Sequence, residues 1–219
     1  MKDPQTEEFN GVTFKVKQPS NERPQAILVM LHGWTGSETS TWVLTEGLSA
    51  EFLIIAPRGF HKVETHSGYG WADISLPQDE LWESYQRSTH ALFTWLMEYL
   101  DANSLKNVPV LLGGFSQGAM LAYYLMLFYP GKFRLASCLA GAIMPQAEIL
   151  ITPERVRNAR FYIAHGTRDK IIPVHRARRA VQLLQQAGAD VTYCESDIGH
   201  KASPECYANL IRFLNTSLD

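Results

Sequence analysis

The stretch Val108-Pro109-Val110-Leu111-Leu112-Gly113-Gly114-Phe115-Ser116-Gln117-Gly118 decides the fold. Its residues up to Phe115 are mostly apolar, and the run is short enough for a buried strand. From Gln117 to Tyr129 the chain is again strongly apolar, which predicts a buried helix that starts directly after the strand. A strand that enters a helix in this way needs a sharp turn at Ser116. Glycine at 114 and 118 suits that turn, because a Cβ at either position would clash.

Outward from this unit, apolar runs and amphipathic stretches alternate along the chain. Continuous apolar runs, typical of strands covered on both faces of a parallel sheet, lie at 26–31, 52–56, 135–143 and 161–164. Helical patterns lie at 81–100, 173–187 and 203–214. Strand patterns of a half-buried or edge type lie at 12–16 and 191–194. The alternation predicts an α/β fold with one mostly parallel central sheet and helices on both of its faces.

Length and charge limit the class of protein. The 219 residues predict one domain, with an N-terminal edge-strand region at 1–25 and a core at about 26–214. Lys and Arg number 20 and Asp and Glu number 22, so the net charge of −2 gives no basic surface for nucleic acid. The apolar runs are far shorter than the roughly 20 residues of a membrane helix, so we expect no integral membrane segment. Nothing in the sequence excludes a homodimer.

Cysteine usage and the start of the chain predict the compartment. The cysteines are Cys138, Cys194 and Cys206. Their odd number and the absence of a Cys-x-x-Cys pair predict reduced thiols rather than a disulfide framework. The polar, acidic start does not match a secretory signal, so we expect a cytoplasmic protein. His61, His66 and His90 have no Cys or carboxylate at the spacing of metal ligands, and no metal or other cofactor is expected.

Functional side chains of such a fold gather where the strands end. Ser116 lies at such an end, in a Gly-x-Ser-x-Gly pattern that presents a hydroxyl as a nucleophile. An alcohol needs a neighbouring base, and the base needs an orienting acid; in this turn type the acid and then the histidine follow the serine. Asp169 follows the strand at 161–164 and His200 follows the strand at 191–194. The sequence therefore predicts Ser116, Asp169 and His200 as a catalytic triad.

Competing residues are present near these positions. His165 lies at the end of a strand, inside a turn, and is interpreted as a structural or supporting residue. Asp197 precedes His200 in the same loop and stays open as an alternative acid. Serine at 116, rather than cysteine or aspartate, disfavours the chemistry of dienelactone hydrolases and haloalkane dehalogenases.

The remaining parts of an acyl-transfer site are also predicted. The backbone N–H groups of Gln117 and Trp34 are expected to bind the oxyanion of the transition state. The predicted apolar lining of the substrate site consists of Trp71, Ile143, Met144 and Ile172, any of which can equally belong to the core. Only a short segment, 144–157, lies between the strand patterns at 135–143 and 161–164, so no large cap domain is expected.

Together these motifs resemble the α/β-hydrolases and, more narrowly, the phospholipase/carboxylesterase family that includes the acyl-protein thioesterases. The residues that carry the resemblance lie at 31–33, 114–119, 165–173 and 199–200. The resemblance implies Ser116 as nucleophile, Asp169 and His200 as its partners, and oxyanion donors at 34 and 117. The chain departs from the family at Trp34-Thr35-Gly36-Ser37 and at Ala119, which bears on substrate choice rather than on mechanism.

We therefore predict a serine hydrolase that cleaves carboxylic esters or thioesters of small to medium acyl groups through an acyl-enzyme. Its partner is a small-molecule ester, and no cofactor is needed. Two other functions stay open, because a fold with a triad does not establish turnover. These are an acyltransferase and a non-hydrolytic ligand-binding protein.

Overall fold

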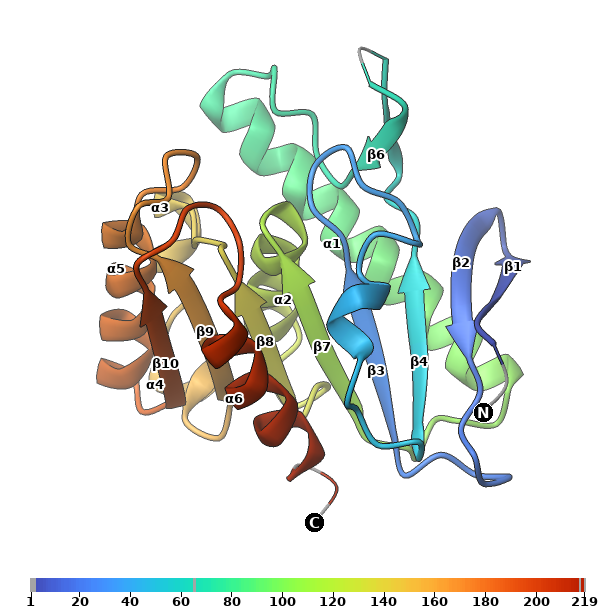
Figure 1. Cartoon of the computed structure of the whole chain (residues 1–219). Helices are drawn as coiled ribbons and strands as arrows, with labels where there is room; N and C mark the ends of the chain where they lie inside the picture. Colours follow the sequence, from blue (N-terminus) through green and yellow to red (C-terminus); the bar gives the residue numbers. More distant parts are fainter. Residues whose placement is uncertain (1–2, 65, 217, 219) are drawn as a thin grey trace.

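The computed structural model describes residues 3–64, 66–216 and 218, and within them the main element is an eight-stranded sheet (Figure 1). Its strands are β1 (Gln5–Phe9), β2 (Val12–Lys17), β3 (Ala26–Leu31), β4 (Phe52–Pro57), β7 (Val110–Phe115), β8 (Leu135–Leu139), β9 (Arg160–Gly166) and β10 (Asp190–Ser196). Their order across the sheet is β1-β2-β4-β3-β7-β8-β9-β10. Neighbours from β4 to β10 pair in parallel, whereas β1 and β2 are antiparallel to their neighbours. The predicted mostly parallel sheet is confirmed.

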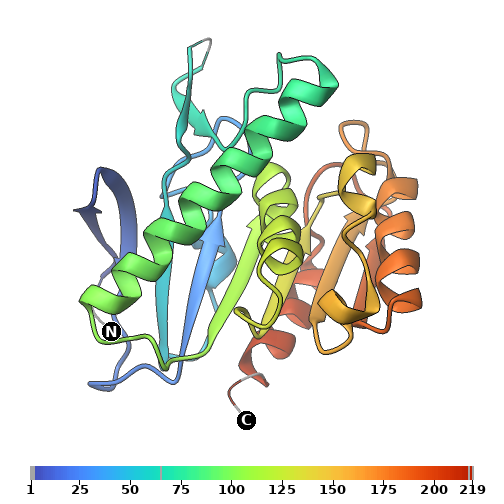
Figure 2. The same ribbon diagram turned by 180° about the vertical axis from the view of Figure 1, so that it is seen from behind.

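Helices cover both faces of the sheet (Figures 1 and 2). The longer ones are α1 (Gln78–Ala102), α2 (Gln117–Phe128), α5 (Val174–Gln186) and α6 (Pro204–Asn215). Helices α1, α2 and α5 pack on one face, and α6 packs on the other together with the 3₁₀ helix η1 (Trp42–Thr45). The observed layers match the predicted α/β-hydrolase fold.

Strand β3 shows why the central runs are apolar throughout. Side chains alternate between the two faces of a strand, and both faces of this one are covered. Ile27, Val29 and Leu31 pack in the cluster that includes α1 and α2, while Leu28 and Met30 pack in the cluster that includes α6. Burying one such side chain is worth about 1.5–3 kcal/mol, so the apolar run fixes the strand at the centre of the sheet.

The edge of the sheet differs from the prediction. Strand β1 was not expected, because most of its residues are exposed and polar and it has no alternating pattern. It forms through a hairpin at Asn10 and Gly11, both of which have a positive φ, at 46° and 76°. The outermost strand is therefore β1, and β2 lies between β1 and β4.

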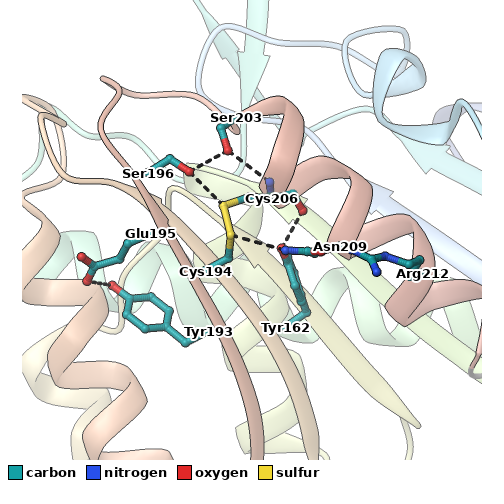
Figure 3. Close-up of a disulfide and its surroundings, with 9 residues drawn as sticks. All are labelled: Tyr162, Tyr193, Cys194, Glu195, Ser196, Ser203, Cys206, Asn209 and Arg212. Carbon is teal, nitrogen blue, oxygen red and sulfur yellow. Dashed lines mark hydrogen bonds between the residues drawn. A yellow bond between two sulfur atoms is a disulfide. The ribbon is translucent and has the colours of Figure 1, made fainter.

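The prediction of three reduced thiols is wrong for two of the cysteines. Cys194 in β10 and Cys206 in the first turn of α6 form a disulfide, with their Cα atoms 5.8 Å apart (Figure 3). Cys138 is a buried free thiol whose pKa burial raises. The pairing arises because α6 folds back over the end of β10, and neither cysteine number nor spacing carries that information.

Among the residues that the structure describes, no large cap covers the carboxyl ends of the strands. The segment 144–157 forms only the one-turn helices α3 (Pro145–Glu148) and α4 (Pro153–Val156). A small hairpin of β5 (His61–Val63) and β6 (Gly68–Gly70) projects at this end of the sheet (Figure 1). Within the described ranges, no helix combines the length and the apolar character needed to cross a bilayer.

Candidate active site

Ser116 sits on a strained turn between β7 and α2. Its φ of 54° and ψ of −116° fall in a region that residues other than glycine rarely adopt. The flanking glycines are required by close backbone contacts. A Cβ on Gly114 would lie 2.3 Å from the carbonyl oxygen of Gly118, and one on Gly118 would lie 2.1 Å from that of Leu31. The predicted reason for the glycine spacing is therefore what the backbone shows.

The three residues chosen by chain order lie together. The Nε2 atom of His200 is 2.8 Å from the Ser116 hydroxyl oxygen, and its Nδ1 atom is 2.6 Å from Oδ2 of Asp169. The serine follows β7, the aspartate follows β9 and the histidine follows β10. Because these strands are parallel, their carboxyl ends meet at one edge of the sheet, and residues 84 and 31 positions apart come into contact.

Asp169 is held as an ionised carboxylate. Burial by itself raises its pKa, but hydrogen bonds from His200 and from the backbone N–H groups of Ile172 and Ile171 outweigh burial, so the pKa lies below its usual value. The two backbone donors reach Oδ1 at 2.9 and 2.8 Å. A carboxylate facing Nδ1 keeps the imidazole proton on that atom, which leaves Nε2 free to accept the serine proton.

The competing residues take other places. His165 is buried, and its Nε2 atom lies 2.7 Å from the Ile172 carbonyl oxygen and 3.3 Å from Oδ2 of Asp169, so it supports the segment that carries the carboxylate. The side chain of Asp197 is 78% exposed and pairs with Arg168 at 2.9 Å, away from the imidazole. Among the described residues, no group of three or more His, Cys, Asp or Glu side chains is arranged to hold a metal ion.

The loop that carries Trp34 passes directly beside Ser116. A Cβ on Gly33 would lie 3.3 Å from the Cβ of Ser116, so glycine allows this approach. Within the described part of the chain, no acceptor is bonded to the backbone N–H of Trp34 or of Gln117. Two free N–H groups next to a serine hydroxyl are the arrangement that an oxyanion requires.

His32 sets the orientation of the peptide group that joins Gly33 to Trp34. The Gly59 N–H donates to Nε2 of His32 at 2.8 Å, so the ring proton is on Nδ1 and donates to the Gly33 carbonyl, also at 2.8 Å. Burial lowers the pKa of His32 and keeps it neutral. In a planar trans peptide the C=O and N–H bonds point in opposite directions, so fixing the Gly33 carbonyl also fixes the Trp34 N–H.

The side chain of Gln117 has a role that sequence reasoning missed. Its Oε1 accepts a hydrogen bond from the backbone N–H of Trp71 at 2.6 Å, and its Nε2 donates to the carbonyl of Ala72 at 2.8 Å. One residue thus offers a backbone N–H beside Ser116 and also holds the segment that follows β6. The sequence signal was a glutamine directly after Gly-x-Ser, at the start of a helix predicted to be buried, because a buried amide needs hydrogen-bond partners.

A cavity of about 450 Å³ opens at Ser116 and His200. Its walls are mostly apolar and include Trp34, Ile74, Leu81, Tyr85, Met120, Ile171 and Ile172. Of these, only Trp34 and Ile172 were named from the sequence. Met120 was detectable, because it lies one helical turn after Ser116 on α2.

The other predicted lining residues lie elsewhere. Trp71 is 1% exposed and donates its indole N–H to the His32 carbonyl at 2.8 Å, so it supports the Trp34 loop from below. Ile143 lines a separate cavity together with His175 and Arg176. Met144 is buried, and its backbone N–H meets the Tyr124 hydroxyl at 3.3 Å. The structure does not place these three residues around the Ser116 cavity.

Known proteins resemble this chain over nearly its full length. Acyl-protein thioesterase 1 of Emericella nidulans is 24% identical over 90% of this chain and 92% of its own length. Among solved structures, a carboxylesterase from Mesorhizobium loti matches with a TM-score of 0.80 and 23% identity, covering 97% of this chain and 99% of that one. Acyl-protein thioesterase 2 of Zea mays matches with a TM-score of 0.70 and 22% identity, covering 94% and 99%.

The family follows from a match to a family model. The model described as Phospholipase/Carboxylesterase matches residues 13–218. This range spans the six parallel strands from β3 to β10 and the whole site described above. The structural neighbours show the same fold. The chain therefore belongs to the phospholipase/carboxylesterase family, a group of α/β-hydrolases that contains esterases and thioesterases.

Proposed function

We propose that the chain is a carboxylesterase-type serine hydrolase that cleaves carboxylic esters or thioesters of small to medium acyl groups. One observation carries the proposal. His200 lies between the Ser116 hydroxyl and the Asp169 carboxylate, at 2.8 and 2.6 Å. A nucleophile bonded to a base, with the base bonded to a buried acid, is the arrangement that activates an alcohol.

The first step forms an acyl-enzyme. Nε2 of His200 takes the proton of Ser116, whose oxygen attacks the carbonyl carbon of the ester. The N–H groups of Trp34 and Gln117 bind the resulting oxyanion. The imidazolium then gives its proton to the leaving oxygen or sulfur as the bond to the acyl carbon breaks.

The second step releases the acid. His200 accepts a proton from water while the water oxygen attacks the acyl carbon, and a second tetrahedral intermediate forms. Ser116 leaves and recovers its proton from His200, which restores the resting enzyme. Throughout, Asp169 stabilises the imidazolium, and its lowered pKa keeps it ionised for this task.

The shape of the cavity supports small to medium acyl groups. It has apolar walls from Leu81 and Met120, and its described lining contains no charged side chain other than His200, when that residue is protonated. The short segment 144–157 adds no lid over it. Such a site favours uncharged acyl chains over phosphorylated substrates.

Active-site labelling combined with ester hydrolysis tests the proposal. The wild-type protein is expected to react with a fluorophosphonate at one serine and to hydrolyse p-nitrophenyl esters across a series of chain lengths. Ser116→Ala is expected to lose the label and to lower kcat by about 10⁴–10⁶-fold. Ser20→Ala removes an exposed hydroxyl far from the site along the chain and should keep both properties.

Other outcomes point to the alternative functions. Labelling of Ser116 without turnover of any ester or thioester would favour the ligand-binding protein. Turnover that needs an alcohol or amine acceptor and is absent in water alone would favour the acyltransferase. Near-wild-type hydrolysis by Ser116→Ala would refute the serine mechanism altogether.

The proposal includes a cytoplasmic location and keeps a homodimer open. The expected cytoplasmic location depended in part on reduced thiols, and the Cys194–Cys206 disulfide removes that argument. Trapping the two thiols by rapid alkylation in cells tests the location, because a cytoplasmic protein would be expected to carry them reduced. Sedimentation velocity of the purified protein tests the homodimer.

A further inference from the structure

A second cavity lies beside the one that opens at Ser116. Its volume is about 490 Å³, and the two cavities share Gly33 and Phe115 as lining residues. Its apolar walls come from Val43, Leu44, Phe115, Ala202, Pro204 and Tyr207, and its lining also includes the oppositely charged Glu46 and Lys201. Neither the mechanism above nor the family assignment gives this space a role. Because it shares these residues with the cavity that contains the nucleophile, it is placed to hold part of the same substrate.

One wall of the second cavity is tied to α6. The Tyr207 hydroxyl donates to the carbonyl oxygens of Val43 and Glu46, at 3.3 and 2.5 Å. These bonds join η1 and the residue after it to the helix that follows His200. The distance between the two sides of the cavity is therefore fixed by the fold.

The opposite wall, residues 201–204, is also anchored. The Ser203 hydroxyl accepts from the Cys206 N–H at 3.1 Å and pairs with the Ser196 hydroxyl at 2.7 Å (Figure 3). The disulfide between Cys194 and Cys206 closes the same loop covalently. A cavity between two anchored walls is a preformed site, which lowers the entropic cost of binding.

The chemistry decides which part of an ester enters each cavity. His200 returns its proton to the leaving oxygen, so the leaving group departs beside the imidazole. His200 itself lines the first cavity, at its border with the second: the second cavity is walled by the residues directly after His200, and Phe115, whose ring centroid is 5.1 Å from that of His200, lines both cavities. The first cavity includes Trp34 and Gln117, whose N–H groups face the carbonyl oxygen, so the acyl chain extends there.

We propose that the second cavity binds the alcohol or thiol part of the substrate, and that the preferred substrates are esters of bulky, uncharged, apolar alcohols. This inference rests on the proposed hydrolase function and specifies its substrate class. The apolar walls favour an aromatic or branched group over a sugar, and the single cation of the described lining, Lys201, is accompanied by the anion Glu46, so the lining offers no net positive charge to a phosphate. Val43, which is 69% exposed, extends the apolar surface to the mouth of the cavity.

A crossed series of esters tests the assignment. Acetates of methanol, butanol, benzyl alcohol and 2-naphthylmethanol vary the alcohol, and ethyl esters of acetic, butyric and octanoic acid vary the acyl chain. All of these alcohols are primary, so the series changes the size of the leaving group far more than its chemistry. For the wild-type protein, kcat/KM is expected to rise along the alcohol series.

Two matched tryptophan variants separate the cavities. Leu44→Trp fills the second cavity and is expected to lower the ratio of kcat/KM for 2-naphthylmethyl acetate over methyl acetate by about 10-fold or more, which corresponds to about 1.4 kcal/mol or more of lost binding. Leu81→Trp fills the first cavity and should instead lower the ratio of octanoate to acetate. If Leu44→Trp lowers the acyl-chain ratio instead, or lowers neither ratio, the proposal is overturned.

Binding of the free alcohol separates this inference from the proposed function. Calorimetry with 2-naphthylmethanol and the Ser116→Ala protein needs no turnover. The alcohol site is supported, even if no ester is hydrolysed, when Leu44→Trp weakens binding about 10-fold and Leu81→Trp weakens it less than Leu44→Trp does. Absence of binding, or binding equally sensitive to both variants, overturns it even if the enzyme is active on other esters.

Discussion

The turn that carries Ser116 and the loop that carries His200 are held in place by different means. Around Ser116 the position is set by the backbone alone, since Gly114 and Gly118 meet carbonyl groups of neighbouring segments at distances that exclude any side chain. The His200 loop also has a close backbone contact, since a Cβ on Gly166 would lie 2.2 Å from the Gly199 carbonyl oxygen, but it is held in addition by side-chain links, among them a disulfide and the pair Ser196–Ser203.

This difference affects how well each arrangement can be predicted from the sequence, and how easily each catalytic residue can be displaced. Close backbone contacts require glycine, and these glycines appear in the sequence within two residues of Ser116. A side-chain solution joins residues from β10 and α6, and no short motif records it. The position of the serine is therefore set by the backbone of its own turn, whereas that of the histidine depends in addition on bonds that a change of redox state or a single substitution can remove.

The largest expected effect concerns the acid that orients His200. Asp169→Asn keeps the shape of the side chain but removes the charge that fixes the imidazole tautomer, so kcat should fall by about 10⁴-fold. Steady-state hydrolysis of a p-nitrophenyl ester measures it. Asp197→Asn, in the His200 loop itself, is the matched control and should change kcat less than twofold, because that side chain faces solvent. A larger loss from Asp197→Asn than from Asp169→Asn would reverse the assignment.

The backbone solution at Ser116 can be broken by one methyl group. In Gly118→Ala the new Cβ would lie 2.1 Å from the Leu31 carbonyl oxygen, and the backbone must shift. We expect a loss of about 3 kcal/mol or more in the free energy of unfolding, measured with urea, together with loss of activity. Gly199→Ala places its Cβ in open space and should cost less than about 0.5 kcal/mol. Equal costs in the two variants would contradict the role of close packing.

The link at His200 can be removed without touching the serine. Replacing Cys194 and Cys206 together by alanine should lower the free energy of unfolding by about 3 kcal/mol, since the bond closes a loop of 12 residues. A reducing agent should lower the stability of the wild-type protein by a similar amount and leave the double variant unchanged. Stability of the wild type that does not respond to reductant would show that the bond does not form in solution.

The smallest effect concerns the buried histidine beside the turn. Burial lowers the pKa of His32, so below a pH of about 6.5 the unfolded chain binds a proton on this ring that the folded protein excludes. Stability should therefore fall as the pH drops below that value, by up to about 1.4 kcal/mol per pH unit from this group. Urea unfolding between pH 5.5 and 8 measures the slope.

A pair of variants isolates the contribution of His32 to that slope. His32→Gln removes the titrating ring and should flatten the fall in stability towards low pH. His175 lies exposed on α5 and gives the matched variant His175→Gln. If His175→Gln flattens the pH dependence as much as His32→Gln does, the buried ring is not the source of the fall in stability.

Much of the fold was predictable because its signals are local. Strand β3 was placed to the residue, since a run buried on both faces must be apolar throughout. The helix predicted at 203–214 begins with such a local signal, since the Ser203 hydroxyl accepts from the Cys206 N–H at the start of α6. Strand β1 was missed because it is an exposed edge whose pairing comes from the hairpin turn and not from burial.

The site was predictable only in part, because only some of its signals are local in the sequence. Chain order sufficed to select Ser116, Asp169 and His200, which lie within hydrogen-bonding distance. The walls were not selected correctly, because an aromatic residue in a sequence carries no sign of what lies next to it. Trp71 has its indole N–H bonded to the His32 carbonyl, a contact between segments 39 residues apart.

The disulfide also determines what a protease would release. Lys201 is exposed and lies inside the loop that Cys194 and Cys206 close, so trypsin can cut there only as a nick within a covalent ring. The fragment that begins at Ala202, with all of α6, would stay attached to the rest of the chain. Such nicked protein would run as one species on a gel without reductant and as two with it.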